Sequence, residues 1–200
     1  ILLTTPGGYY KIKGDNITID NEHYYIMIRA DNITLDGDGK EINVTSNYFG
    51  LVQNGNDNTS GHSCTIKNIG VTASDEGSLA SDEGSLYDGG GWVCQSNFGR
   101  GLTASDTITV TNCYSTGGIS LAAGGIIGRA ANYNSSATIT VSNCYSTGQI
   151  HTLGGGIIGN YANGVSSRGK IMVTNCYSIG DISTEASSFV AGGILGADAN

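Results

Sequence analysis

The sequence predicts an all-β chain folded as a right-handed parallel β-helix, with about three short strands in each coil. Two observations predict it. A unit of about 31 residues recurs in the second half of the chain, and glycine and asparagine punctuate short β-branched runs throughout. Apolar residues at helical spacing never continue beyond about two turns, so no amphipathic helix is expected. Propeller blades need about 40–45 residues, so the shorter unit favours one coil of a solenoid.

The composition limits the classes of partner. The chain has 200 residues, nine lysines and arginines in total, and a formal net charge of −8. We expect no nucleic-acid partner, because neutralising phosphates requires a basic face, and no anionic membrane surface for the same reason. Membrane insertion is not expected either, since no apolar run approaches the about 20 residues of a spanning helix.

The repeats occupy residues 90–200. Cys113, Cys144 and Cys176 lie 31 and 32 residues apart, and a Gly-Gly-Ile-Ile/Leu-Gly segment follows each of them. The third copy carries an insertion around TEASSF. In the second copy, strands are expected in TITVSN, GQIHT and GGIIGNY, with neighbouring coils about 4.8 Å apart.

An older, eroded copy precedes these repeats. CTIKNIGV, from Cys64, aligns with ITVTNCYS, from Ile108, which places Asn68 opposite Asn112. GGWVC, from Gly90, aligns with GGIIG, from Gly124.

Residues 1–72 use a different pattern, which we interpret as narrower coils, capped or narrowed near the N-terminus. GDNITID, from Gly14, recurs 16 residues later as ADNITLDGDGKEI. Residues 73–89 form an acidic excursion that contains the tandem heptapeptide ASDEGSLASDEGSL. The chain starts without a signal-peptide pattern and stops within a repeat, so we expect a piece of a longer protein.

Two segments resemble known families. IMIRADNITLDGDGKEI, from Ile26, is similar to the opening coils of pectin-lyase-like right-handed β-helix proteins. GGIIGRAANYNSSATITVSNCYSTGQI, from Gly124, resembles the GLUG-motif repeats of large bacterial surface proteins and adhesins. The resemblance implies a β-helix at a cell surface. It does not choose an activity, because β-helices also serve as lyases, hydrolases, tailspikes and ice-binding proteins.

The repeated cysteines are interpreted as packing residues. No Cys-x₂₋₄-Cys pair suits zinc, and an odd number of cysteines cannot all pair. Cys113, Cys144 and Cys176 occupy equivalent slots, so they are expected to stack as small apolar side chains, with Ile69 in the eroded copy. One disulfide among them is the alternative, although stacked Cβ vectors run parallel and suit it poorly.

The asparagines before these cysteines are interpreted as a second structural ladder, made of Asn68, Asn112, Asn143 and Asn175. Asparagine tolerates the left-handed conformation, so it can form a sharp turn between two strands. Strict alternation would otherwise prevent Val110 and Cys113 from both facing the core, so a bend at Asn112 is expected.

Tyr114, Tyr145 and Tyr177 follow the cysteines and are expected to point outward. They are the candidate ligand-binding residues, because an exposed aromatic column can stack on sugar faces or on a partner surface. The alternative is structural packing beneath a loop or against a neighbouring chain.

Catalytic constellations are scarce, and no enzyme, cofactor or metal is expected. A calcium site at Asp36, Asp38 and Glu41 would lack the remaining ligands of an EF-hand loop. The threonines around Thr109 and Thr140 raise ice binding as an alternative, but Lys170 and Met172 interrupt the pattern in the third copy.

We therefore expect a non-catalytic extracellular structural and adhesive module, a stalk or surface fibre. Its expected partners are carbohydrate or a host surface, with further repeats or another chain covering the C-terminal edge. A polysaccharide-degrading β-helix enzyme or tailspike-like depolymerase is the first alternative, and an ice-binding protein is the second.

Overall fold

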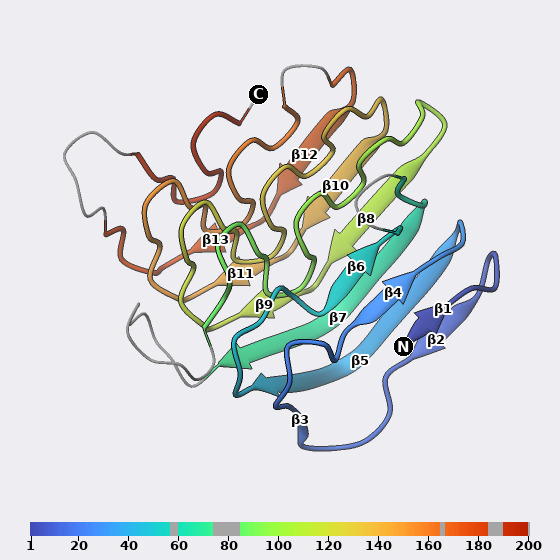
Figure 1. The fold of residues 1–200 in the computed structure, drawn as a ribbon, viewed down its shortest axis with the longest axis horizontal. Helices are drawn as coiled ribbons and strands as arrows, with labels where there is room; N and C mark the ends of the chain where they lie inside the picture. Colours follow the sequence, from blue (N-terminus) through green and yellow to red (C-terminus); the bar gives the residue numbers. More distant parts are fainter. Residues whose placement is uncertain (57–59, 74–84, 165–166, 184–189, 200) are drawn as a thin grey trace.

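The computed structural model describes residues 1–56, 60–73, 85–164, 167–183 and 190–199, and these residues form strands and turns without a helix. All pairings between named strands are parallel, and successive coils lie side by side along one axis (Figure 1). The predicted all-β parallel β-helix is therefore confirmed. The tandem heptapeptide and the TEASSF insertion fall largely on residues 74–84 and 184–189, outside the described residues.

The strands form two sheets. The smaller sheet contains β1 (Leu2–Leu3), β4 (Ile26–Ile28) and β6 (Val52–Asn54). The larger sheet contains β2 (Tyr9–Lys11), β3 (Ile17–Ile19), β5 (Ile33–Val44), β7 (Cys64–Ala73), β8 (Thr107–Thr111), β9 (Tyr114–Ser115), β10 (Thr138–Ser142), β11 (Tyr145–Ser146), β12 (Lys170–Thr174) and β13 (Tyr177–Ser178).

The three Cys repeats stack in register. Ile139 of β10 pairs with Ile108 of β8 on one side and with Ile171 of β12 on the other. The eroded copy joins the same stack as predicted, since Cys64 pairs with Ile108. The alignment of the glycine segments was wrong by one residue, because Gly91 rather than Gly90 pairs with Gly124.

The strands within a repeat differ from those expected. The first predicted strand forms as β10, but the other two are reduced to isolated bridges at Ile150, Gly155 and Ile158. The second strand of each coil comes instead from the Tyr-Ser pair of the Asn-Cys-Tyr-Ser motif, as in β11. The glycine segments turn too tightly to form strands: a Cβ on Gly155 would overlap the carbonyl oxygen of Ile158.

The early coils are shorter, and their repeat differs from the internal sequence similarity. Tyr9 pairs with Thr34 and Ile17 pairs with Ile42, so the coil step is 25 residues. The two similar Asp-Asn-Ile-Thr segments, 16 residues apart, therefore do not stack on each other. The reason is that β5 is long enough to pair with both β2 and β3 on either side of an irregularity between Asp36 and Lys40.

The interior of the coils is apolar. Ile108, Val110, Ile139 and Val141 alternate inward with outward threonines and serine, as period-2 strands require. Larger side chains fill the corners, and the buried Trp92 donates its indole N–H to the Gly117 carbonyl oxygen at 3.0 Å. At the N-terminal end, apolar side chains of the first coil line a hollow of about 550 Å³.

Candidate functional site

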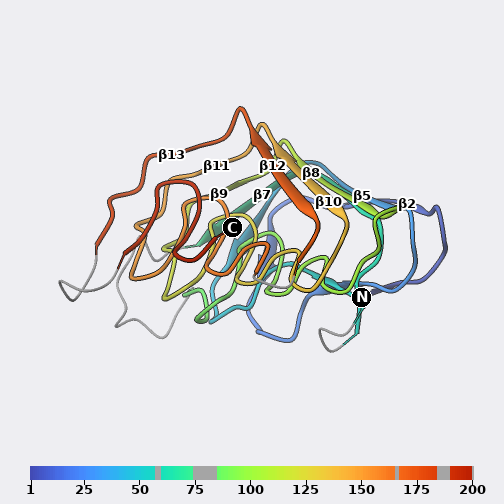
Figure 2. The same cartoon turned by 90° about the horizontal axis from the view of Figure 1, so that it is seen from above.

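The candidate site is built around one corner of the coil. Seen along the stack, the large sheet bends sharply between β8, β10 and β12 on one side and β9, β11 and β13 on the other (Figure 2). The asparagines of the repeated motif lie at this bend in the left-handed conformation, with φ between 52° and 56°: Asn68, Asn112, Asn143 and Asn175. The turn at Asn112 lets both Val110 and Cys113 point inward, where both are buried.

The asparagine side chains hydrogen-bond along the stack. Asn112 Nδ2 donates to Asn68 Oδ1 at 3.1 Å, and Asn175 Nδ2 donates to Asn143 Oδ1 at 3.3 Å. At the N-terminal end, Asn68 Nδ2 donates to Asp36 Oδ1 at 2.9 Å. Asp36 was not predicted to be a member of the asparagine ladder. The sequence signal for it was the DGDG segment, which places an acidic side chain in this part of the coil.

The cysteines fill the inside of the same corner. All five in the chain are free thiols, and Cys113 and Cys144 are buried whereas Cys176 is half-buried. Each repeated thiol lies 3.2–3.3 Å from the carbonyl oxygen two residues before it, as Cys144 does from Ser142. The hydrogen bond with Cys113 and burial together raise the pKa of Cys144, so this thiol stays protonated at neutral pH.

The tyrosines form a stacked column outside the corner. The ring centroids of Tyr114 and Tyr145 are 5.0 Å apart, those of Tyr145 and Tyr177 are 5.1 Å apart, and both pairs are within 4° of parallel. The two faces of Tyr145 are therefore occupied by its neighbours. The column presents ring edges and hydroxyl groups to solvent rather than the open faces expected for sugar stacking.

The column ends on Gly70 and Glu41. Gly70 occupies the tyrosine slot of the preceding coil, and a Cβ there would overlap the Tyr114 ring. The space lets the Tyr114 hydroxyl donate to Glu41 Oε2 at 2.6 Å. Desolvation of the phenol, the larger cause, and this hydrogen bond together raise the pKa of Tyr114 to about 12.

A groove of about 680 Å³ lies beside this column, two to four residues further along each coil. Thr116 and Thr147 directly follow β9 and β11, and they are half-buried like Tyr114 and Tyr145 while the serines between them are buried, so they face the same side as the tyrosines. Among the described residues, the other polar side chains on the groove are Gln149 and Asp181. Hydroxyl, amide and carboxylate groups in this arrangement can exchange hydrogen bonds with sugar hydroxyls.

The three acidic residues considered for calcium point to separate partners. Asp36 is buried and accepts from the Tyr9 hydroxyl, Asn68 Nδ2 and the Asp38 backbone N–H. These donors, led by Tyr9, hold the pKa of Asp36 well below its usual range. Asp38 forms an ion pair with Lys11 at 2.7 Å, and Glu41 accepts from Tyr114. Their oxygens do not converge on one point.

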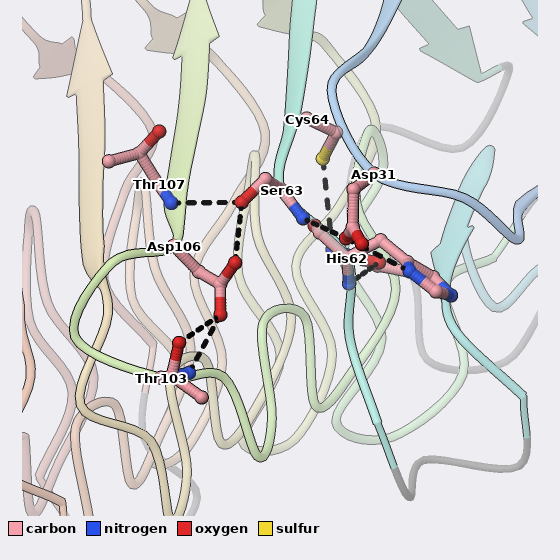
Figure 3. Close-up of polar contacts among 8 residues, drawn as sticks. Asp31, His62, Ser63, Cys64, Thr103, Asp106 and Thr107 are labelled. Atoms are coloured by element: carbon pink, nitrogen blue, oxygen red, sulfur yellow. Dashed lines mark hydrogen bonds and ion pairs between the residues drawn. The ribbon is translucent and has the colours of Figure 1, made fainter. Parts of the chain in front are cut away.

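A second polar cluster surrounds His62 (Figure 3). His62 Nδ1 lies 3.1 Å from Asp31 Oδ1, which also accepts from the backbone N–H of Ser63 at 3.2 Å. The Ser63 hydroxyl is turned the other way, where it donates to Asp106 and accepts from the Thr107 N–H. Serine, histidine and aspartate are thus present, but Ser63 is not paired with the imidazole as a nucleophile would be. The cluster joins neighbouring turns.

Two further observations concern metal ions and membranes. No group of three or more histidine, cysteine, aspartate or glutamate side chains is arranged to hold a metal ion in the part of the chain described. No helix among those residues is long and apolar enough to cross a membrane.

Comparison of the chain with protein-family models, with curated proteins and with solved structures found no match. The coarse architecture, parallel sheets stacked in register as in a β-solenoid, therefore rests on the structure itself.

Proposed function

We propose that this chain is a non-catalytic structural and adhesive repeat module that acts outside the cell or on a particle surface. The register of the repeat coils carries the proposal: β8, β10 and β12 pair residue for residue, and the repeated tyrosines of the motif form a continuous column. In such a stack, each coil adds contacts only with its neighbours, so stability accumulates along the axis. That property suits a stiff stalk or fibre.

The motif pattern supports the proposed location. Residues 90–200 resemble the GLUG-motif repeats of bacterial surface proteins, and the early coils resemble the start of pectin-lyase-like β-helices. The first resemblance favours a surface protein. The repeated polar residues are also engaged with one another, since the asparagines, tyrosines and cysteines contact their equivalents or nearby backbone groups.

The adhesive part of the proposal concerns the tyrosine column and the adjacent groove. We assign glycan contact to the hydroxyl rim of Tyr114, Tyr145 and Tyr177 and to the polar side chains beside it. Tyr177, at the end of the column, is 51% exposed, and the coil or chain proposed below to cover this edge would also cover its outer face. This arrangement favours hydrogen bonding to sugar hydroxyls over ring stacking along the column.

A further coil or another chain is proposed to cover the β12–β13 edge. Ile119 and Ile150 are fully buried, whereas Ile182 in the same slot of the last coil is 52% exposed. Leu195 is likewise 41% exposed where Ile127 and Ile158 are buried. An open parallel edge with apolar side chains is a surface that other strands pair with readily.

The test is glycan binding by the triple variant Y114F/Y145F/Y177F, which keeps the stacked rings and removes the hydroxyl rim. We expect neutral immobilised glycans that bind the parent chain to lose at least about tenfold in affinity for this variant, because each lost polar contact weakens the complex. Tyr24→Phe, an exposed tyrosine outside the column, is the matched control. Unchanged binding by the triple variant would show that the column only packs.

The two alternatives predict different readouts from the same protein. A polysaccharide-degrading enzyme releases new chain ends, and an ice-binding protein produces thermal hysteresis. The adhesive proposal predicts neither, and either activity in the parent chain would replace it.

A further inference from the structure

A second groove, of about 510 Å³, lies on segments that follow the glycine-rich turns. Its side chains include Arg100, Arg129, Tyr133, Tyr161, Asp88 and Asn97. These residues come from three successive coils, because the segments begin after Cys94, Ile127 and Ile158, which bridge to one another in register. The groove is distinct from the tyrosine column, which lies on β9, β11 and β13.

Each arginine in this groove is placed over a tyrosine of the next coil. Arg100 Cζ is 5.2 Å from the centroid of the Tyr133 ring, and Arg129 Cζ is 5.2 Å from that of Tyr161. These distances suit cation–π contacts. Tyr133 is in turn held from behind, since a Cβ on Gly164 would lie 2.7 Å from its ring. The two guanidinium groups are therefore positioned by packing.

Neither guanidinium has an acidic partner within 4.0 Å among the described residues, where the ion pairs involve lysines and histidines. Asp88 lines the same groove but forms no ion pair with them. The chain has a net charge of −8, whereas this groove carries two arginines and one described carboxylate, that of Asp88. The N–H donors of the two arginines form no ion pair with a described acidic residue and can bind an anionic ligand.

We propose that this groove binds carboxylate groups of an acidic glycan, such as a chain of uronic acids. A guanidinium group presents paired donors that match a carboxylate, and stacking on tyrosine orders the side chain before binding. Asp88 and Asn97 supply acceptors and a donor for sugar hydroxyls. A densely charged polyanion such as nucleic acid fits less well, because the chain has a net charge of −8 and phosphate neutralisation requires more cations.

The arrangement along the axis favours an extended ligand. The Arg100–Tyr133 pair spans the first and second of the three coils, and the Arg129–Tyr161 pair spans the second and third. The two arginines lie one coil apart along the stack and, in the register of Cys94 with Ile127, four residues apart along the coil. An extended glycan that crosses the two coils obliquely meets both arginines, while a lone carboxylate meets one.

The test compares a hexamer of 1,4-linked glucuronic acid with cellohexaose, its neutral counterpart, by titration calorimetry at low ionic strength. We expect the parent chain to bind the acidic hexamer and not cellohexaose, and R100Q/R129Q to bind it at least about tenfold more weakly. Arg168→Gln, which removes one positive charge outside the groove, is the control and is expected to bind like the parent.

A second variant separates a binding defect from misfolding. R100K/R129K keeps both charges but lacks the planar paired donors, so we expect it to fold with the parent's unfolding midpoint and to bind several-fold more weakly. The proposal is overturned by a parent chain that ignores the acidic hexamer, by equal binding of cellohexaose, by an equal loss in R168Q, or by equal binding of a DNA oligomer through the same two arginines. The Y114F/Y145F/Y177F variant should bind the hexamer like the parent, so this result is independent of the tyrosine column.

Discussion

The repeat stack ends differently on its two sides. Toward β5, the asparagine and tyrosine columns stop on carboxylates: Asn68 donates to Asp36, and Tyr114 donates to Glu41. Toward β12 and β13, the columns stop on the same residue types that fill the middle, and Tyr177 is simply more exposed. The β5 end of the stack therefore has carboxylates that the middle coils lack, whereas the β12–β13 end has the same residue types as the middle coils.

The difference follows from what identical side chains can do when stacked about 5 Å apart. An amide both donates and accepts, and a neutral ring packs on its copy, so asparagine and tyrosine can repeat without repulsion. A column of identical charges could not, because like charges at this distance repel. A charged side chain therefore suits the end of a column. Asp36 and Glu41 occupy such positions, because a carboxylate accepts hydrogen bonds from the column but has no hydrogen-bond donor with which to continue it.

The largest contrast we predict is in thiol reactivity between the middle and last coils. A bulky thiol reagent should label Cys176, which is half-buried, under native conditions. Cys113 and Cys144 should react more than about 100-fold more slowly, because the reagent must wait for the coil to open. Labelling followed by mass spectrometry of the peptides measures this. Rapid modification of Cys113 and Cys144 in the folded chain would break the comparison and the interior assignment of this column.

A matched pair of glycine variants tests the same contrast in stability. A Cβ on Gly156 would overlap the Gly193 carbonyl oxygen and the Ser178 side chain, whereas a Cβ on Gly193, in the equivalent slot of the last coil, meets nothing within 4 Å. We expect Gly156→Ala to lower the free energy of unfolding by about 3 kcal/mol. Gly193→Ala should change it by less than about 0.5 kcal/mol. Urea unfolding of both variants gives the values, and equal effects would contradict the proposed stacking.

The carboxylate end is tested by Asp36→Asn. This change removes a charged acceptor from Tyr9 and Asn68, and we expect a loss of about 2 kcal/mol at neutral pH. Because the folded pKa of Asp36 is depressed, its contribution is complete above the unfolded pKa of about 3.9 and is lost as pH falls through the folded value. The parent should therefore lose stability more steeply than the variant below about pH 4.

The control for this pH dependence is Asp15→Asn. Asp15 is exposed and paired with Lys40, so its removal should alter unfolding only slightly. If the stability of Asp36→Asn falls below about pH 4 as steeply as that of the parent, Asp36 does not stabilise the end of the asparagine ladder.

The smallest effect concerns the tyrosine column. Glu41→Gln removes the carboxylate beside Tyr114, whose pKa is raised to about 12 chiefly by desolvation. We expect the pKa to fall but to stay above the usual value of about 10, because burial of the ring is unchanged. Ultraviolet titration of the phenolate follows it, with Tyr114→Phe identifying the signal. An unchanged pKa of Tyr114 would show that Glu41 does not interact with the tyrosine column.

Much of the corner could be predicted from the sequence, because period and residue type act together there. Equal spacing of Asn112, Asn143 and Asn175 placed them in one slot, and asparagine's tolerance of positive φ identified the slot as a bend. The bend in turn required the following cysteine to face inward. The mispredictions lie where local similarity misleads: the two Asp-Asn-Ile-Thr segments look like successive coils, yet β5 pairs with both β2 and β3.

The sequence by itself determined the class of fold, the coil length of the repeats and the residues that share a column, since each follows from repetition along one chain. Only the tertiary structure decided that the tyrosine faces cover one another, that Asp36 and Glu41 end the columns, and that Arg100 and Arg129 rest on tyrosines of the next coil. The physical reason is that these contacts form between side chains of different coils. Their geometry depends on how side chains pack across the stack, which spacing along the chain does not encode.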